Sequence, residues 1–163
     1  MKDLVLKRLP TLLVVDDNIE QTTKIIQNSF RINEISNYLS DVNLLTCESA
    51  SEVSELAKEH EIDTVIVDLK MPTDNGELDV REGLDIVSFC VGNLDAAVIV
   101  FSAEAHDDAE ALSMREGADD YIEKFDGRNR ISLRTKYWLD RIFDEKRKKI
   151  ETYALAGFEF KPG

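Results

Sequence analysis

The chain has 163 residues and a formal net charge of −13, from 33 acidic and 20 basic residues, a length that favours one domain with one core. No run of about 18 apolar residues occurs, and residues 1–10 lack the long apolar stretch of a secretion signal, which argues against a membrane segment and leads us to expect a cytoplasmic protein. The acidic charge argues against nucleic-acid binding by the main domain, and the separation of Cys47 from Cys90, without clustered histidines, argues against a disulfide framework or a zinc site.

Short apolar runs that indicate buried β-strands alternate along the chain with the apolar spacing of amphipathic helices. The predicted strands are residues 12–15, 42–46, 64–67, 97–101 and 120–122. The predicted helices are residues 19–39, 50–59, 81–91, 105–116 and 128–153. This alternation is typical of an α/β fold in which helices cover both faces of a parallel sheet.

Polar residues stand just past four of the five predicted strands. Asp16 and Asp17 follow the first strand, Asp68 the third, Ser102 the fourth and Lys124 the fifth. Because the carboxyl ends of parallel strands lie along one edge, we expect these side chains to converge there. Three carboxylates, a hydroxyl and an ammonium group suit a divalent cation, a phosphoryl group and a nucleophilic aspartate.

Each of these residues also has an ordinary structural interpretation. Asp17 or Asn18 could cap the helix that is expected to begin near Ile19. Ser102 could be a strand-end hydroxyl, and Lys124 a surface charge. The coincidence of all of them at strand ends favours the functional interpretation.

Four segments carry a resemblance to a known family. They are Val14-Val15-Asp16-Asp17-Asn18, Val65-Ile66-Val67-Asp68-Leu69-Lys70-Met71-Pro72, Val98-Ile99-Val100-Phe101-Ser102-Ala103 and Gly117-Ala118-Asp119-Asp120-Tyr121-Ile122-Glu123-Lys124. Together, and in this order, they resemble the receiver domain of two-component response regulators, including the chemotaxis regulators. The resemblance implies a flavodoxin-like (βα)5 fold, a doubly wound parallel sheet with strand order 2-1-3-4-5. We divide the chain into a receiver domain, residues 1–145, and a C-terminal helical extension and tail, residues 146–163.

The resemblance implies that Asp68 is a phosphoacceptor, which takes a phosphoryl group from a phosphohistidine on a histidine kinase or phosphotransfer protein. Attack by an aspartate requires that the negative charge of the phosphoryl group be neutralised, which Mg²⁺ does. The implied metal ligands are Asp16, Asp17, Asp68 and the backbone carbonyl of Lys70. Ser102 would hydrogen-bond a phosphoryl oxygen, and Lys124 would pair with the phosphate.

The resemblance also implies a switch made by Ser102 and Tyr121. The family carries an aromatic residue at the position of Tyr121 that moves inward when the phosphorylated site draws in the hydroxyl residue. Such coupling would repack the surface of the fourth helix, fifth strand and fifth helix, and thereby act on an output protein that the sequence does not identify. The alternative is that Tyr121 only packs at a strand edge.

The chain departs from the family near Lys124 and after Asp68. Phe125 follows Lys124 where the family usually has a proline after a cis peptide bond, and a non-prolyl cis bond costs about 2.5–4 kcal/mol. The bond is either cis despite this cost or trans, in which case the aim of Lys124 at the phosphate is less certain. Residues 73–82 form a longer link than usual, in which Asn75-Gly76 indicates a turn or small hairpin on the surface.

The carboxyl-terminal part also departs from the family. Only 39 residues follow Lys124, too few for a helix-turn-helix output domain after the last helix, so we expect a stand-alone receiver without a DNA-binding domain. The extended helix and its aromatic tail, with Phe158 and Phe160, could dock a partner, pack on the domain or form a homodimer. Residues 128–149 contain nine basic and three acidic residues, which favours a solvated helix face over contact with nucleic acid, an acidic partner or the acidic body.

Three classes of function follow from these features. The favoured class is a phosphorylatable signalling switch that catalyses only its own phosphorylation and dephosphorylation. The second is a pseudo-receiver, which binds proteins without phosphorylation. The third is a haloacid-dehalogenase-like phosphatase, but that family carries a second aspartate two residues after a nucleophile on the first strand, and here the residue two beyond Asp16 is Asn18.

Overall fold

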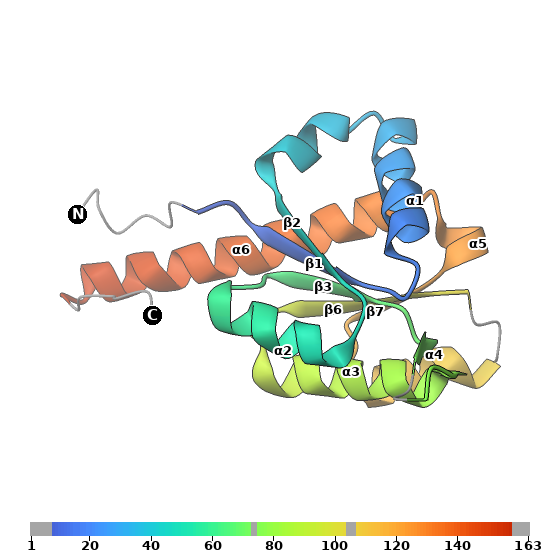
Figure 1. Ribbon diagram of the computed structural model, residues 1–163. Helices are drawn as coiled ribbons and strands as arrows, with labels where there is room; N and C mark the ends of the chain where they lie inside the picture. Colours follow the sequence, from blue (N-terminus) through green and yellow to red (C-terminus); the bar gives the residue numbers. More distant parts are fainter. Residues whose placement is uncertain (1–7, 73–74, 104–106, 158–163) are drawn as a thin grey trace.

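A five-stranded parallel sheet forms the centre of the computed structural model, which describes residues 8–72, 75–103 and 107–157 (Figure 1). Its strands are β1 (Thr11–Val15), β2 (Asn43–Cys47), β3 (Thr64–Val67), β6 (Ala97–Ser102) and β7 (Asp120–Glu123). They lie in the order β2-β1-β3-β6-β7. Since β6 and β7 are the fourth and fifth strands of this sheet along the chain, the predicted order 2-1-3-4-5 is confirmed.

Helices cover both faces of the sheet, as predicted (Figure 1). One face packs against α1 (Ile19–Ile32) and α6 (Ile131–Leu155), and the other against α2 (Ala50–Glu59), α3 (Val80–Asn93) and α4 (Asp107–Arg115). Because successive residues of a strand point to opposite faces, Ile66 joins the α1 and α6 core while Val65 and Val67 join the other. Burial on both faces explains why the strands are continuous apolar runs.

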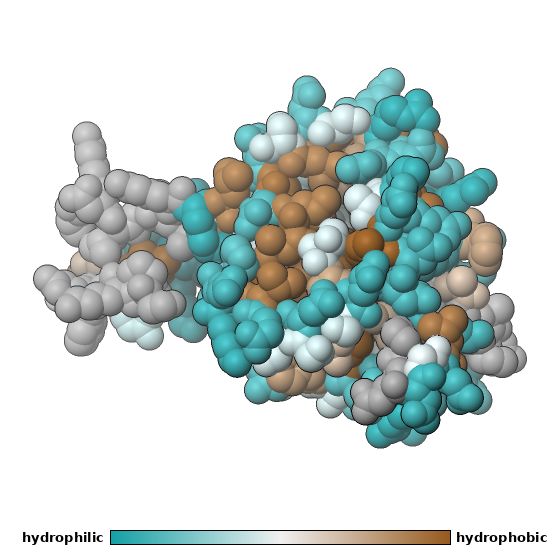
Figure 2. Space-filling model, in the orientation of Figure 1, coloured by the Kyte–Doolittle hydropathy of each residue, from teal (hydrophilic) through white to brown (hydrophobic). Residues whose placement is uncertain are grey.

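The β2 strand forms one of the two lateral edges of the sheet, and β7 forms the other. Figure 2 shows hydrophobic residues gathered in the region of β2, with hydrophilic residues around them. Leu44 and Leu45 are only half-buried there, because an edge strand has a neighbouring strand on one side alone.

The predicted helix over residues 19–39 is wrong as a single element. The α1 helix ends at Ile32, and a 3₁₀ helix, η2 (Ser36–Asp41), follows it. Glu34 adopts a left-handed φ of 60°, and the amide of Ile35 donates to the carbonyl of Phe30 at 2.9 Å, which closes the helix end. Ile35, Tyr38 and Leu39 still pack on the same core as α1, so the apolar pattern continues through the break and conceals it.

The predicted helix over residues 128–153 is present as one continuous helix, α6, and the predicted turn at Asn75-Gly76 is also present. A short helix, α5 (Lys124–Gly127), precedes α6. Strands β4 (Met71–Pro72) and β5 (Leu78–Asp79) pair antiparallel as a small hairpin, and Gly76 has a φ of 80°, which glycine adopts without steric cost. The hairpin therefore accounts for the long link after Asp68.

The α6 helix continues without interruption across the predicted domain boundary between residues 145 and 146. Two of its basic residues form ion pairs with the acidic body: Arg134 pairs with Asp120 at 2.6 Å, and Lys146 pairs with Glu61 at 2.7 Å and Asp63 at 2.9 Å. Between the described residues, its other ion pairs lie within the helix. Phe158 and Phe160 lie outside the described residues. Among the described helices, none is both long and apolar enough to cross a membrane.

Close packing of α3 against the residue after Asp68 yields a stability prediction. The amide of Gly83 donates to the carbonyl of Leu69 at 3.0 Å, and an added Cβ would lie 2.1 Å from that oxygen. Because the clash involves backbone, Gly83→Ala is expected to lower the free energy of unfolding by about 2 kcal/mol, measured by urea denaturation.

Gly92→Ala is the matched control on the same helix, because an added Cβ there meets nothing within 4 Å. It should be neutral or stabilise by up to about 1 kcal/mol. Equal effects of the two substitutions would show that the close approach at Leu69 does not matter.

Candidate functional site

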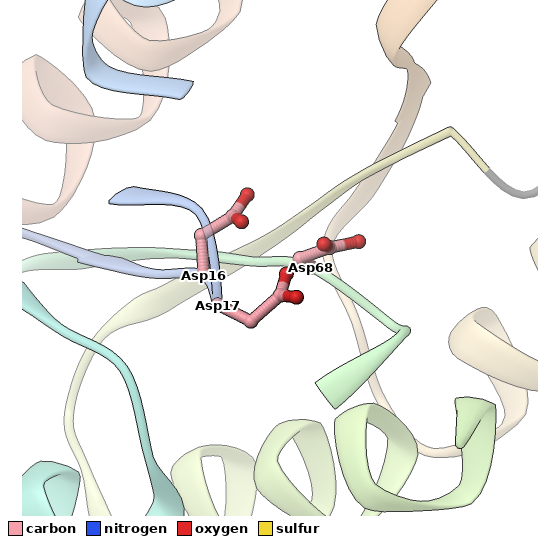
Figure 3. Close-up of side chains that lie close together, drawn as sticks. All are labelled: Asp16, Asp17 and Asp68. Atoms are coloured by element: carbon pink, nitrogen blue, oxygen red, sulfur yellow. The ribbon is translucent and has the colours of Figure 1, made fainter. Parts of the chain in front are cut away.

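Three carboxylates gather at the carboxyl edge of the sheet (Figure 3). Asp16 and Asp17 follow β1, and Asp68 follows β3, which is the neighbouring strand. One oxygen from each lies within 4.8 Å of the others. Asp16 and Asp68 are buried, whereas Asp17 is exposed. These three residues are called the acidic site below.

Asp16 is held by donors from three directions. Its Oδ1 accepts from the backbone amide of Asn18 at 2.8 Å, and its Oδ2 accepts from the hydroxyl of Thr22 at 2.6 Å and from Lys124 Nζ at 2.7 Å. Asn18 is the N-cap residue of α1, but its side chain donates to Gln21 and makes no capping bond. Asp16 is therefore oriented by the turn from β1 into α1, by the first turn of α1 and by the residue that follows β7.

Lys124 reaches the acidic site from the first position of α5. Its Nζ lies 3.5 Å from Asp68 Oδ2 as well as 2.7 Å from Asp16 Oδ2. No peptide bond between described residues is cis, so the Lys124–Phe125 bond is trans. The trans bond does not turn Lys124 away from Asp68.

The environment of the acidic site shifts the pKa values of two of its carboxyl groups. Burial raises the pKa of Asp68 to about 6, and the charges of Asp16 and Asp17 add to this rise while Lys124 opposes it. Asp17 is exposed as a residue, but partial loss of water around its carboxylate and then the charge of the neighbouring Asp16 raise its pKa as well. Closely spaced carboxylates with a single ammonium group concentrate negative charge that a divalent cation would relieve.

The donor set fits Mg²⁺. It consists of carboxylate oxygens, which this hard cation prefers, and it leaves room for water or phosphoryl oxygens as further ligands. Asp16, Asp17 and Asp68 are the residues that would hold the ion. Lys70 lies two residues after Asp68 and is exposed, and its carbonyl as a fourth protein ligand stays a prediction.

The two predicted switch residues lie on adjacent strands. Ser102 is the last residue of β6 and is buried, so it lies at the same edge of the sheet as the acidic site. Tyr121 is the second residue of β7, pairs with Val100 in register, and packs half-buried against the core that faces α2 and α3. Their roles in phosphate binding and switching stay predictions.

Thr22 is a site residue that the sequence interpretation missed. It lies in the first turn of α1, is 2% exposed, and contacts both Asp16 and Lys124. The available signal was its position just after the Asp16-Asp17 pair, where a short polar side chain on the helix can reach back to the strand end.

Comparison with known proteins assigns these features to a family. The family model described as response regulator receiver domain matches residues 12–136. The aerobic respiration control protein ArcA of Escherichia coli K12 is 24% identical over 156 residues, which cover 92% of this chain and 59% of ArcA. The transcriptional regulatory protein KdpE of Mycobacterium tuberculosis H37Rv is 31% identical over 113 residues, 69% of this chain and 43% of KdpE. The chain thus spans about three fifths or less of these relatives.

Solved structures share the fold. A response regulator from Thermotoga maritima has a TM-score of 0.61 and 24% identity, with 81% of this chain and 98% of that chain covered. The signal receiver domain of an HD domain-containing protein from Pseudomonas fluorescens Pf-5 has a TM-score of 0.68 and 17% identity, with 86% and 94% covered. Both are similar to this chain in architecture.

Proposed function

The chain belongs to the response regulator receiver domain family, and from this we propose that it is a phosphoacceptor switch in which Asp68 takes a phosphoryl group in a Mg²⁺-dependent reaction. The observation that carries the proposal is the acidic site with Lys124 Nζ 3.5 Å from Asp68 Oδ2. The carboxylates of Asp16 and Asp17 and the ammonium group of Lys124 lie close to Asp68, which is buried and directly follows the central strand β3. The proposed donor is a histidine kinase or a phosphotransfer protein.

The proposed reaction is an in-line transfer. A carboxylate oxygen of Asp68 forms a bond to phosphorus while the bond from phosphorus to the donor's imidazole nitrogen breaks, and the imidazole, protonated on its other nitrogen, leaves as the neutral ring with the electron pair of the broken bond. Bound Mg²⁺ supplies charge neutralisation for the phosphoryl oxygens. Lys124 pairs with a phosphoryl oxygen, and the Ser102 hydroxyl donates a hydrogen bond to another.

The proposed output is a change in a protein-binding surface. Movement of Ser102 toward the phosphoryl group would open space into which Tyr121 packs, and this biases the surface formed by α4, β7 and α6 between two states. The recipient is an output protein, and a second copy of this chain docked on α6 is one form that it can take.

A chemical test needs no identified kinase. The purified protein is incubated with acetyl phosphate or phosphoramidate and Mg²⁺, and intact mass is measured. We expect one added phosphoryl group, and no adduct when EDTA removes the metal.

Failure to form an adduct, together with absence of Mg²⁺ binding by calorimetry, would instead favour the pseudo-receiver. In that case the fold would act through its surface alone. Continuous release of inorganic phosphate with many turnovers per protein would favour a phosphatase.

A further inference from the structure

The side chain of Thr22 connects Asp16 of the acidic site to the ammonium group of Lys124. Its Oγ1 donates to Asp16 Oδ2 at 2.6 Å and accepts from Lys124 Nζ at 3.1 Å. Lys124 Nζ also donates to the same Asp16 oxygen at 2.7 Å. The three groups therefore form a closed triangle of hydrogen bonds, and each member restrains the other two.

The triangle joins elements that are far apart in the chain. Thr22 comes from α1, Asp16 from the end of β1, and Lys124 from the start of α5, which is 102 residues from Thr22. Thr22 is 2% exposed, so its hydroxyl has little access to water. The hydroxyl of Thr22 is uncharged. It therefore influences how Asp16 and Lys124 are oriented and adds no net charge to the site.

Orientation matters for Asp16 because a carboxylate that rotates freely must be ordered when it binds a metal. Asn18 holds Oδ1, and Thr22 with Lys124 holds Oδ2, so both oxygens are already directed. Partners that hydrogen-bond a ligating carboxylate typically contribute about 10–100-fold to metal affinity.

We propose that Thr22 is a positioning residue of the acidic site, whose hydroxyl binds Asp16 and Lys124 together and thereby orients Asp16 for Mg²⁺. This inference rests on the proposed function, because it concerns the metal of that same site. The role proposed for Thr22 is indirect, because its hydroxyl acts through Asp16 and Lys124.

The test compares Mg²⁺ affinity among single variants by isothermal titration calorimetry on protein stripped with EDTA. Thr22→Val removes the hydroxyl and keeps the shape, and we expect its Mg²⁺ dissociation constant to rise about tenfold. Thr22→Ala also lacks the hydroxyl and should show the same loss. Thr22→Ser keeps the hydroxyl and should bind Mg²⁺ nearly as well as the parent protein.

Thr64→Val is the matched control for removal of a buried hydroxyl. Thr64 is fully buried at the first position of β3, and its Oγ1 has no hydrogen-bond partner among the described residues. Thr64 lies at the amino end of β3, whereas the acidic site lies at the carboxyl end of that strand. Its substitution should therefore leave the Mg²⁺ affinity unchanged.

A kinetic measurement separates positioning from general damage. In Thr22→Val, the Mg²⁺ concentration for half-maximal adduct formation should rise about tenfold, while the rate at saturating Mg²⁺ stays near that of the parent protein. Unchanged or tighter Mg²⁺ binding in Thr22→Val, or an equal loss in Thr22→Ser, overturns the role of Thr22. Absence of Mg²⁺ binding by the parent protein would instead overturn the proposed function.

Discussion

Asp68→Asn is expected to abolish the phosphoryl adduct and, in EDTA at neutral pH, to raise the free energy of unfolding by about 2–3 kcal/mol. The adduct is lost because an amide is not a nucleophile toward phosphorus. The gain in stability arises because burial raises the pKa of Asp68 from 3.8 to about 6, so the folded state disfavours the charged carboxylate. Asparagine has nearly the same shape and no charge.

The sign of the pH dependence follows from the raised pKa. The folded state binds the Asp68 proton more tightly than the unfolded state, so the contribution of this group to stability is complete below pH 3.8 and is lost as the pH rises through about 6. The stability difference between Asp68→Asn and the parent protein should therefore grow between these pH values and remain constant above them.

Urea denaturation in EDTA at several pH values measures this difference. Asp85→Asn is a suitable control, because Asp85 pairs with Arg81 on the exposed surface of α3 and loss of this pair should change stability by about 0.5 kcal/mol or less. Equal stability of Asp68→Asn and the parent protein at neutral pH would contradict the electrostatic account. Addition of Mg²⁺ should stabilise the parent protein more than the variant.

The second large effect is expected at the amino ends of the strands, where Asp63 directly precedes β3. Asp63→Asn should lower the free energy of unfolding by about 3–5 kcal/mol. The fully buried Asp63 accepts from both terminal nitrogens of Arg8 at 2.6 and 2.7 Å, from the amide of Thr11 at 2.7 Å and from Lys146 Nζ at 2.9 Å. An asparagine would present a neutral oxygen and an NH₂ donor to these donors. The variant should also loosen the carboxyl-terminal half of α6, which Lys146 ties to β3.

The effect of Asp63 has the opposite pH dependence to that of Asp68. Burial alone would raise its pKa, but the hydrogen bonds from Arg8 and Thr11 and the charge of Lys146 outweigh burial and hold the pKa below its ordinary value of 3.8. Its stabilising contribution is therefore present above pH 3.8 and is lost as the pH falls through the lower, folded-state pKa.

Chemical denaturation at pH 7, together with hydrogen exchange of the α6 amides, checks the prediction for Asp63. Glu20→Gln serves as control, because Glu20 pairs with Lys24 on the exposed surface of α1 and its loss should cost about 0.5 kcal/mol or less. An Asp63→Asn variant as stable as this control would show that the buried network contributes little.

Most of the architecture and the acidic site were predictable from local pattern. The apolar runs that end at Val15, Val67 and Phe101 identify strands, and the strand ends then place Asp16, Asp68 and Ser102 at one edge. The break after α1 was not predictable from periodicity, because Ile35, just before η2, and Leu39, within η2, continue to contact the core of α1. Periodicity reports which side chains are buried and not whether the backbone between them stays helical.

The amino-acid sequence by itself therefore determined the order of strands and helices and the identity of the acidic site, because hydrophobic period and strand-end position are encoded in neighbouring residues. Only the tertiary structure decided that the Lys124–Phe125 bond is trans. It also decided that Thr22 hydrogen-bonds both Asp16 and Lys124, and that Lys146 forms an ion pair with Asp63. These contacts join residues up to 102 positions apart. They depend on how strands pair and helices cross the sheet, and the packing of the whole core sets that geometry.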